Sequence, residues 1–144
     1  MGLDTSHDCW HGPYSAFMRW RTMLAAEIGL PLPLMRGFCS SFKAMPDDAI
    51  KLRDYPPIEW PSAASEPLVM LLNHSDCDGE IAWEVCEAIA GRLDEIVETV
   101  IKRDGLLAVV GSARADYDGF VAACERFAAG CRKAHAAKEN VRFS

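Results

Sequence analysis

Apolar residues recur at helical spacing in three long segments of the chain. From Tyr14 to Ile28 they step by three, four and four, which places them on one helix face. Longer stripes run from Gly79 to Ile101 and from Asp116 to His135, each with charged residues opposite. The pattern therefore predicts three main helices. Their stripes are Phe17, Trp20, Leu24 and Ile28; Ile81, Val85, Ile89, Leu93, Ile96 and Val100; and Tyr117, Phe120, Val121, Cys124, Phe127, Ala128 and Cys131.

The middle helix carries the strongest end signals. Asp78 is the predicted N-cap, and Glu80 would complement the helix dipole in the first turn. Late cations and a glycine at Lys102–Gly105 predict its end.

Two short apolar runs interrupt this helical pattern. Leu68–Leu72 suits either a buried strand or the start of a buried helix, because periodicity cannot separate the two. Leu106–Val110 is a candidate strand partner for it, and the tail around Val141 and Phe143 alternates like a docked edge strand. We expect a mainly α, α+β single domain over residues 1–144, with three main helices and one or two short strands.

Two segments lack a clear period. Residues 1–12 form a polar lead without periodicity, and residues 30–67 are divided by prolines into short pieces. Aromatic and aliphatic residues recur in the second segment too often for a free linker. We therefore expect residues 30–67 to cross the core.

The net charge and the cysteine content exclude several classes of function. A formal charge of −6 and a pI of about 5.1 argue against broad nucleic-acid binding, which normally needs a basic face. The polar N-terminus does not resemble a secretory signal, and no apolar run approaches the ~20 residues of a membrane span. The six cysteines form no CxxC pair. We expect a cytoplasmic protein with reduced thiols and no membrane association; its oligomeric state stays open.

The main candidate site is the polar stretch Asn73–Glu80. His74, Asp76 and Asp78 alternate, so in an extended segment their side chains point the same way. Imidazole and carboxylate ligands favour Mn, Zn, Fe or Ni over Ca or Mg. Glu80 would position a water or support the ligands. The alternative is a polar turn in which an aspartate caps the helix and the histidine makes a hydrogen-bonded bridge.

A second candidate group lies at the N-terminus, where Asp4, His7, Asp8, Cys9 and His11 cluster in sequence. If this lead folds over the central loop, His11 would join the metal ligands and His7 would position a water. The alternative is a terminus that is disordered or merely polar. His135, late in the last helix, is expected to be structural because a cation favours that end of the dipole.

Two resemblances follow from these motifs. His74-x-Asp76-x-Asp78-Gly79 resembles the first metal motif of DHH phosphoesterases over about a dozen residues, although the later Asp-His-His element of that family is missing. The resemblance implies metal or phosphate chemistry at this loop. Gly2–Gly12, His74–Ile81 and Lys138–Val141 are together similar to a family of short, uncharacterised bacterial and phage-borne proteins. That family carries no assigned activity, so it implies only a host-takeover or counter-defence context.

The leading function hypothesis is a small site at residues 74–80 that holds a divalent metal or a phosphorylated ligand, and that either hydrolyses the ligand or only binds it. His74, Asp76, Asp78 and His11 would hold the cation, and Glu80 or His7 would act on the water, whose pKa the metal would lower. The alternative is a non-catalytic phage-type protein that captures a host protein or a small nucleotide.

Overall fold

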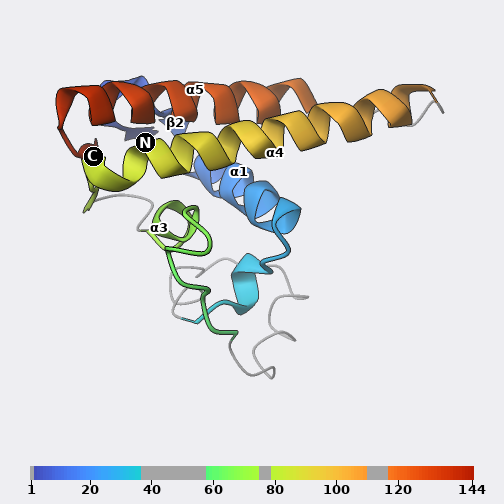
Figure 1. The fold of residues 1–144 in the computed structure, drawn as a ribbon, viewed down its shortest axis with the longest axis horizontal. Coiled ribbons are helices and arrows are strands. Elements are labelled where there is room, and N and C mark those ends of the chain that lie inside the picture. The colour runs from blue at the N-terminus through green and yellow to red at the C-terminus, as the bar shows by residue number, and fades with distance from the viewer. Residues whose placement is uncertain (1, 37–57, 75–78, 110–116) are drawn as a thin grey trace.

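A computed structural model describes residues 2–36, 58–74, 79–109 and 117–144 (Figure 1). Its described part is mainly helical with two short antiparallel ribbons, which confirms the expected fold class. The helices are α1 (Tyr14–Glu27), α3 (Val69–Leu72), α4 (Trp83–Val109) and α5 (Tyr117–Ala137), with 3-10 turns η1 (Ser6–Asp8) and η2 (Leu32–Leu34). The strands are β1 (Gly2–Asp4), β2 (His11–Pro13), β3 (Gly79–Ile81) and β4 (Val141–Phe143).

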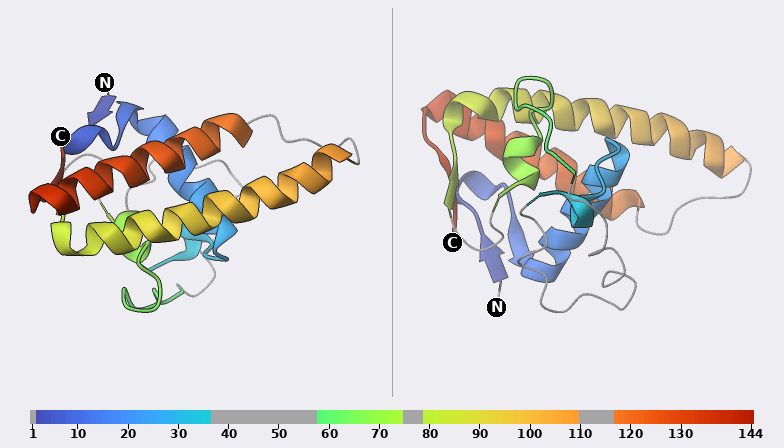
Figure 2. Two further views of the ribbon diagram at one scale, coloured as in Figure 1. Left: turned by 45° about the horizontal axis from the view of Figure 1, so that its top comes forward. Right: turned by 90° about the horizontal axis from the view of Figure 1, so that it is seen from below.

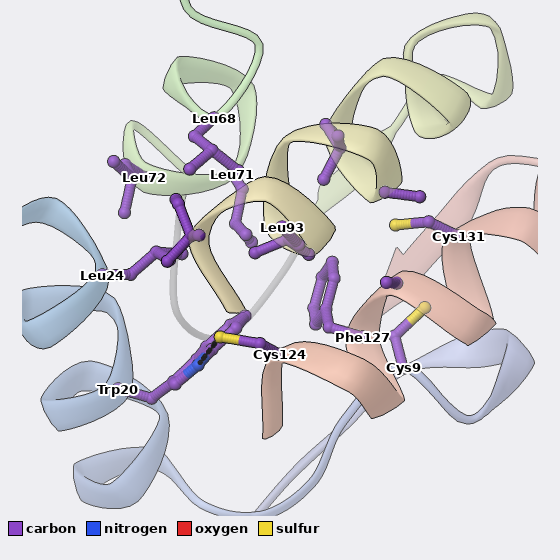
Figure 3. Close-up of a cluster of buried hydrophobic side chains, with 14 of the residues drawn as sticks. Cys9, Trp20, Leu24, Leu68, Leu71, Leu72, Leu93, Cys124, Phe127 and Cys131 are labelled. Atoms are coloured by element: carbon purple, nitrogen blue, oxygen red, sulfur yellow. Dashed lines mark hydrogen bonds between the residues drawn. The ribbon is translucent and has the colours of Figure 1, made fainter. Parts of the chain in front are cut away.

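The core lies where α4 and α5 pack side by side and α1 crosses beneath them (Figures 1 and 2). The predicted stripes point into it: Trp20, Leu93 and Phe127 are all buried (Figure 3). Leu68, Leu71 and Leu72 close the same core from the side of α3. Burial of these side chains supplies most of the driving force for folding.

The two ribbons bring the chain ends together (Figure 1). β1 pairs with β2, and β3 pairs with β4, both antiparallel. Reciprocal backbone hydrogen bonds between Asp4 and Ser144, of 3.1 and 2.9 Å, then join one ribbon to the other, as does a bridge between Thr5 and Phe143. The polar lead, which has no periodicity in the sequence, is ordered because Leu3 and Cys9 are buried. The alternating tail was predicted correctly as a docked strand.

The predicted pairing of Leu68–Leu72 with Leu106–Val110 is wrong for the described residues of both runs. The first run forms the single turn α3, in which the Leu72 and Asn73 amides donate to the Leu68 and Val69 carbonyls at 2.8 Å. The second run continues α4 as far as Val109. Leucine and alanine are strong helix formers, and long packing against α5 overrides the cost of Gly105 within the helix.

Both predicted ends of the middle helix also need correction. It begins at Trp83 because Gly79–Ile81 pairs with β4, and it does not close at Lys102–Gly105. Asp78, the predicted cap, lies outside the described residues. The Oδ1 atom of Asn140 instead accepts a hydrogen bond from the Trp83 amide at 3.1 Å. A side chain from the other end of the chain thus caps α4.

Four cysteines lie in the described part of the chain, and all are free and buried: Cys9, Cys86, Cys124 and Cys131. Burial raises the pKa of Cys124 to about 12. A hydrogen bond between Cys131 and Cys86 raises the pKa of Cys131 and lowers that of Cys86. These thiols therefore act as small core side chains. Within the described ranges, no helix is both long enough and apolar enough to cross a bilayer.

Candidate functional site

A polar pocket of about 470 Å³ opens where the chain ends meet, and we call it the terminal pocket. It lies between the η1 turn, the start of α4 and the segment that links α5 to β4. Its volume falls within the range of small-molecule sites. Its lining residues are Ser6, His7, Trp83, Lys138, Glu139, Asn140 and Arg142.

Asn140 organises one side of this pocket. Besides capping α4, its Nδ2 atom donates to Oε2 of Glu80 at 2.7 Å. Glu80 faces Arg142 directly across the β3–β4 ribbon, with Nε and Oε1 3.7 Å apart. The carboxylate of Glu80 is therefore hydrogen-bonded by one amide and lies loosely opposite one guanidinium.

Ser6 organises the other side. Its Oγ atom accepts a hydrogen bond from the Arg142 amide at 2.9 Å and lies 2.9 Å from Nδ1 of His7. The same hydroxyl reaches the Asn140 carbonyl at 3.4 Å. A polar chain thus runs from Glu80 through Asn140 and Ser6 to His7. It joins the two residues that the sequence predicted to act on a water.

Charged groups surround this polar chain without tight pairing. Nε2 of His7 lies 3.6 Å from Oε2 of Glu139. The side chains of Arg142 and Glu80 are 76% and 49% exposed, so their contact adds little to stability. Lys138 adds a further exposed cation. The cations of the pocket can therefore turn toward a ligand at small cost.

Backbone strain concentrates at the same place. In the described chain, the non-glycine residues with positive φ are His7, Asp8 and Lys138, at 60°, 57° and 55°. Lys138 terminates α5 in the left-handed conformation that glycine normally adopts, and the Glu139 amide bonds to the Ala134 carbonyl at 3.0 Å. Such residues cost free energy and cluster at functional sites. Two of the three line the terminal pocket.

His74, the first predicted metal ligand, lies on the other face of the β3–β4 ribbon. Its ring packs on Phe143 at 4.3 Å between centroids, and its Nε2 atom is 3.2 Å from the Glu80 carbonyl oxygen. Phe143 and Ile81 face the core, whereas alternation turns the Glu80 side chain to the opposite side. His74 and the Glu80 carboxylate are therefore not brought together.

Of the other predicted ligands, the structure describes only His11. His11 pairs with Asp4 at the exposed β1–β2 ribbon and does not join His74. Asp76 and Asp78 lie outside the described residues. Among the residues that are described, no three His, Cys, Asp or Glu side chains form a metal-holding group. Metal binding by His74, Asp76 and Asp78 stays a prediction, which metal analysis of natively purified protein tests.

A buried arginine anchors the loop that carries His74. Arg21 is 1% exposed, and its Nη1 donates to the carbonyls of Leu71, Leu72 and His74 at 3.3, 3.4 and 2.6 Å. A cation there satisfies carbonyls at the end of α3. Sequence reasoning missed Arg21, although it lies four residues after Phe17 and three before Leu24, within the apolar stripe.

The sequence also did not predict most of the residues that line the terminal pocket. Ser6 and Asn140 act through contacts with residues more than fifty positions away, and no local spacing reveals such contacts. The polar turn Lys138–Asn140 between a helix and an alternating tail was the available signal. His135 supports the pocket wall, since its Nδ1 lies 3.1 Å from the Trp83 carbonyl and its ring packs on the indole at 5.6 Å.

Comparison of the chain with protein-family models, curated proteins and solved structures found no match. Function must therefore be inferred from the geometry of the site.

Proposed function

We propose that this protein binds a small nucleotide in the terminal pocket. One observation carries the proposal: two cations, an imidazole, a hydroxyl and an indole line a single pocket of about 470 Å³. Nucleotide binding is the part of the sequence hypotheses that these residues support best. Capture and hydrolysis of the nucleotide would use the same residues.

The phosphate would lie between Lys138 and Arg142. A guanidinium binds phosphate with two parallel hydrogen bonds, and an ammonium adds a mobile point charge. Arg142 is held only at 3.7 Å by Glu80, so its guanidinium can turn toward a phosphate. Glu139 and Glu80 limit the net positive charge, which favours a phosphate with few charges over a polyanion.

The base would stack on Trp83. This indole forms the pocket wall and is backed by the ring of His135. Stacking of a base on an aromatic side chain contributes about 1–3 kcal/mol and accepts any base. Ser6 and His7 line the same pocket and would offer polar contacts to the sugar.

Titration calorimetry with AMP, adenosine and inorganic phosphate tests the proposal. We expect AMP to bind more tightly than either fragment, because only AMP engages both the cations and the indole. Arg142→Gln and Lys138→Gln should each lower the affinity for AMP about tenfold or more, because each removes a charged hydrogen bond to the phosphate. Trp83→Phe should weaken the binding of AMP and of adenosine to the same degree. Any quenching of tryptophan fluorescence that AMP causes through Trp83 in the wild-type protein should be absent from this variant.

Lys133→Gln is the matched control, because Lys133 is an exposed α5 lysine that does not line the pocket. It removes the same charge and should leave AMP binding unchanged. Equal weakening in Lys133→Gln and Lys138→Gln would reduce the effect to net charge and contradict the proposal. Phosphate release from AMP, measured on the same samples, decides between capture and hydrolysis.

A further inference from the structure

A second pocket, of about 310 Å³, lies at the other end of α5, and we call it the aromatic pocket. One face of α1, the first turns of α5 and Trp10, which directly precedes β2, line it. Its lining residues are Trp10, Ala16, Arg19, Trp20, Met23, Gly119, Phe120 and Ala123. It shares no lining residue with the terminal pocket, so what it binds is independent of the nucleotide proposal.

Small residues leave this pocket open. Ala16, Gly119 and Ala123 come from the two facing helices, where larger side chains would fill the space. A Cβ atom on Gly119 would meet nothing within 4 Å. Glycine within a helix costs about 1 kcal/mol relative to alanine, and close packing does not require it here.

The walls of the aromatic pocket are stiff. Trp10 stacks on Trp20 with ring centroids 5.4 Å apart and planes at 26°. Trp20 in turn packs on Phe127 at 5.3 Å and donates its indole N–H to Sγ of Cys124 at 3.4 Å (Figure 3). Rings held from behind in this way offer a preformed apolar surface, which lowers the entropic cost of binding.

Two polar features define the chemistry that this surface would accept. Arg19 is the one charged residue in the lining, and it is exposed. The indole N–H of Trp10 is buried and has no acceptor among the described residues. A buried donor of this kind is uncommon and calls for a partner.

We propose that the aromatic pocket binds a planar aromatic monoanion of one or two rings. Its rings would pack against Trp20 and Phe120, and its carboxylate would pair with Arg19. A volume of about 310 Å³ lies at the low end of ligand sites, which fits a ligand of this size.

Titration with 2-naphthoate tests this inference, with naphthalene-2-carboxamide as the neutral analogue. We expect saturable 1:1 binding of 2-naphthoate with a Kd below about 1 mM. Gly119→Leu should fill the pocket and weaken binding at least tenfold. Gly91→Leu is the matched control, because Gly91 is also a helical glycine whose Cβ would meet nothing within 4 Å, and Gly91 lies on α4.

Arg19→Gln separates the charge from the cavity and does not depend on the folding of the Gly119 variant. It should weaken 2-naphthoate several-fold and leave the carboxamide unchanged. Absence of saturable binding to the wild-type protein would overturn the inference. So would equal affinities of Gly119→Leu and Gly91→Leu for 2-naphthoate.

Discussion

The two pockets lie at opposite ends of α5 and are built in different ways. Helix faces line the aromatic pocket, and the spacing of apolar residues along α1 and α5 predicts those faces. Turns and strand ends line the terminal pocket. Contacts between the two ends of the chain hold these turns and strands in place. The apolar pocket and the polar pocket of this fold therefore rest on separate structural supports.

Because the two pockets rest on different elements, different substitutions should affect them. The aromatic pocket depends on how α1 packs against α5, whereas the terminal pocket depends on how η1 and β4 dock. A substitution in the shared core should damage both pockets, and one at the chain ends should damage only the terminal pocket.

Arg21→Leu should destabilise the fold more than the other substitutions. Arg21 joins α1 to the end of α3, and its loss leaves the carbonyls of Leu71, Leu72 and His74 without this donor. Buried acceptors that lose their donor cost about 1–3 kcal/mol each, and relaxation recovers part of that. We expect the free energy of unfolding to fall by about 3 kcal/mol in urea denaturation.

Arg19→Leu is the control for this change, since Arg19 lies on the same helix but is exposed. It should change the free energy of unfolding by less than about 0.5 kcal/mol. If Arg21→Leu is as stable as Arg19→Leu, Arg21 does not anchor the loop, and its role as derived from the structure is incorrect.

Gly130→Ala tests where the two pockets are coupled. A Cβ atom at this position of α5 would lie 2.8 Å from both the Cα atom of Cys9 and the carbonyl oxygen of His7. The η1 turn would have to move, at a cost of about 2 kcal/mol for overpacking. AMP affinity should fall because His7 moves, and 2-naphthoate affinity should fall less, since only Trp10 follows the turn.

Gly91→Ala should stabilise the fold, in contrast to Gly130→Ala. Its new methyl group meets nothing within 4 Å, so the variant should gain about 0.5–1 kcal/mol from helix propensity alone. A gain of the same size in Gly130→Ala, seen as a rise in the melting temperature, would show that the turn does not pack closely on α5.

The two supports also differ in how well the sequence predicted them. Phe17, Trp20 and Phe127 were placed in the core by spacing alone, because a helix repeats its contacts locally. Gly79–Ile81 was predicted as helix, because a three-residue strand has no pattern of its own and its partner lies some sixty residues away. His7 and Glu80 stood out by residue type, but the chain of polar contacts that joins them depends on tertiary docking.

Asn140→Ala should affect the terminal pocket alone. It removes the side-chain cap of α4 and releases the Glu80 carboxylate. Loss of an N-cap costs about 1 kcal/mol, so the unfolding midpoint should shift modestly. AMP affinity should change while 2-naphthoate affinity stays at the wild-type value. An equal change in both affinities would contradict the separation of the two supports.

Lys138→Gly separates stability from binding within the terminal pocket. Lys138 terminates α5 with φ at 55°, where glycine is favoured, so the substitution should stabilise the fold by about 0.5–1 kcal/mol. It also removes one of the two cations proposed to hold phosphate, so AMP affinity should fall about tenfold. A higher melting temperature combined with weaker AMP binding would mean that the strain at this turn serves ligand binding. Higher stability with unchanged AMP affinity would leave Lys138 without a role in the site and place the phosphate on Arg142 alone.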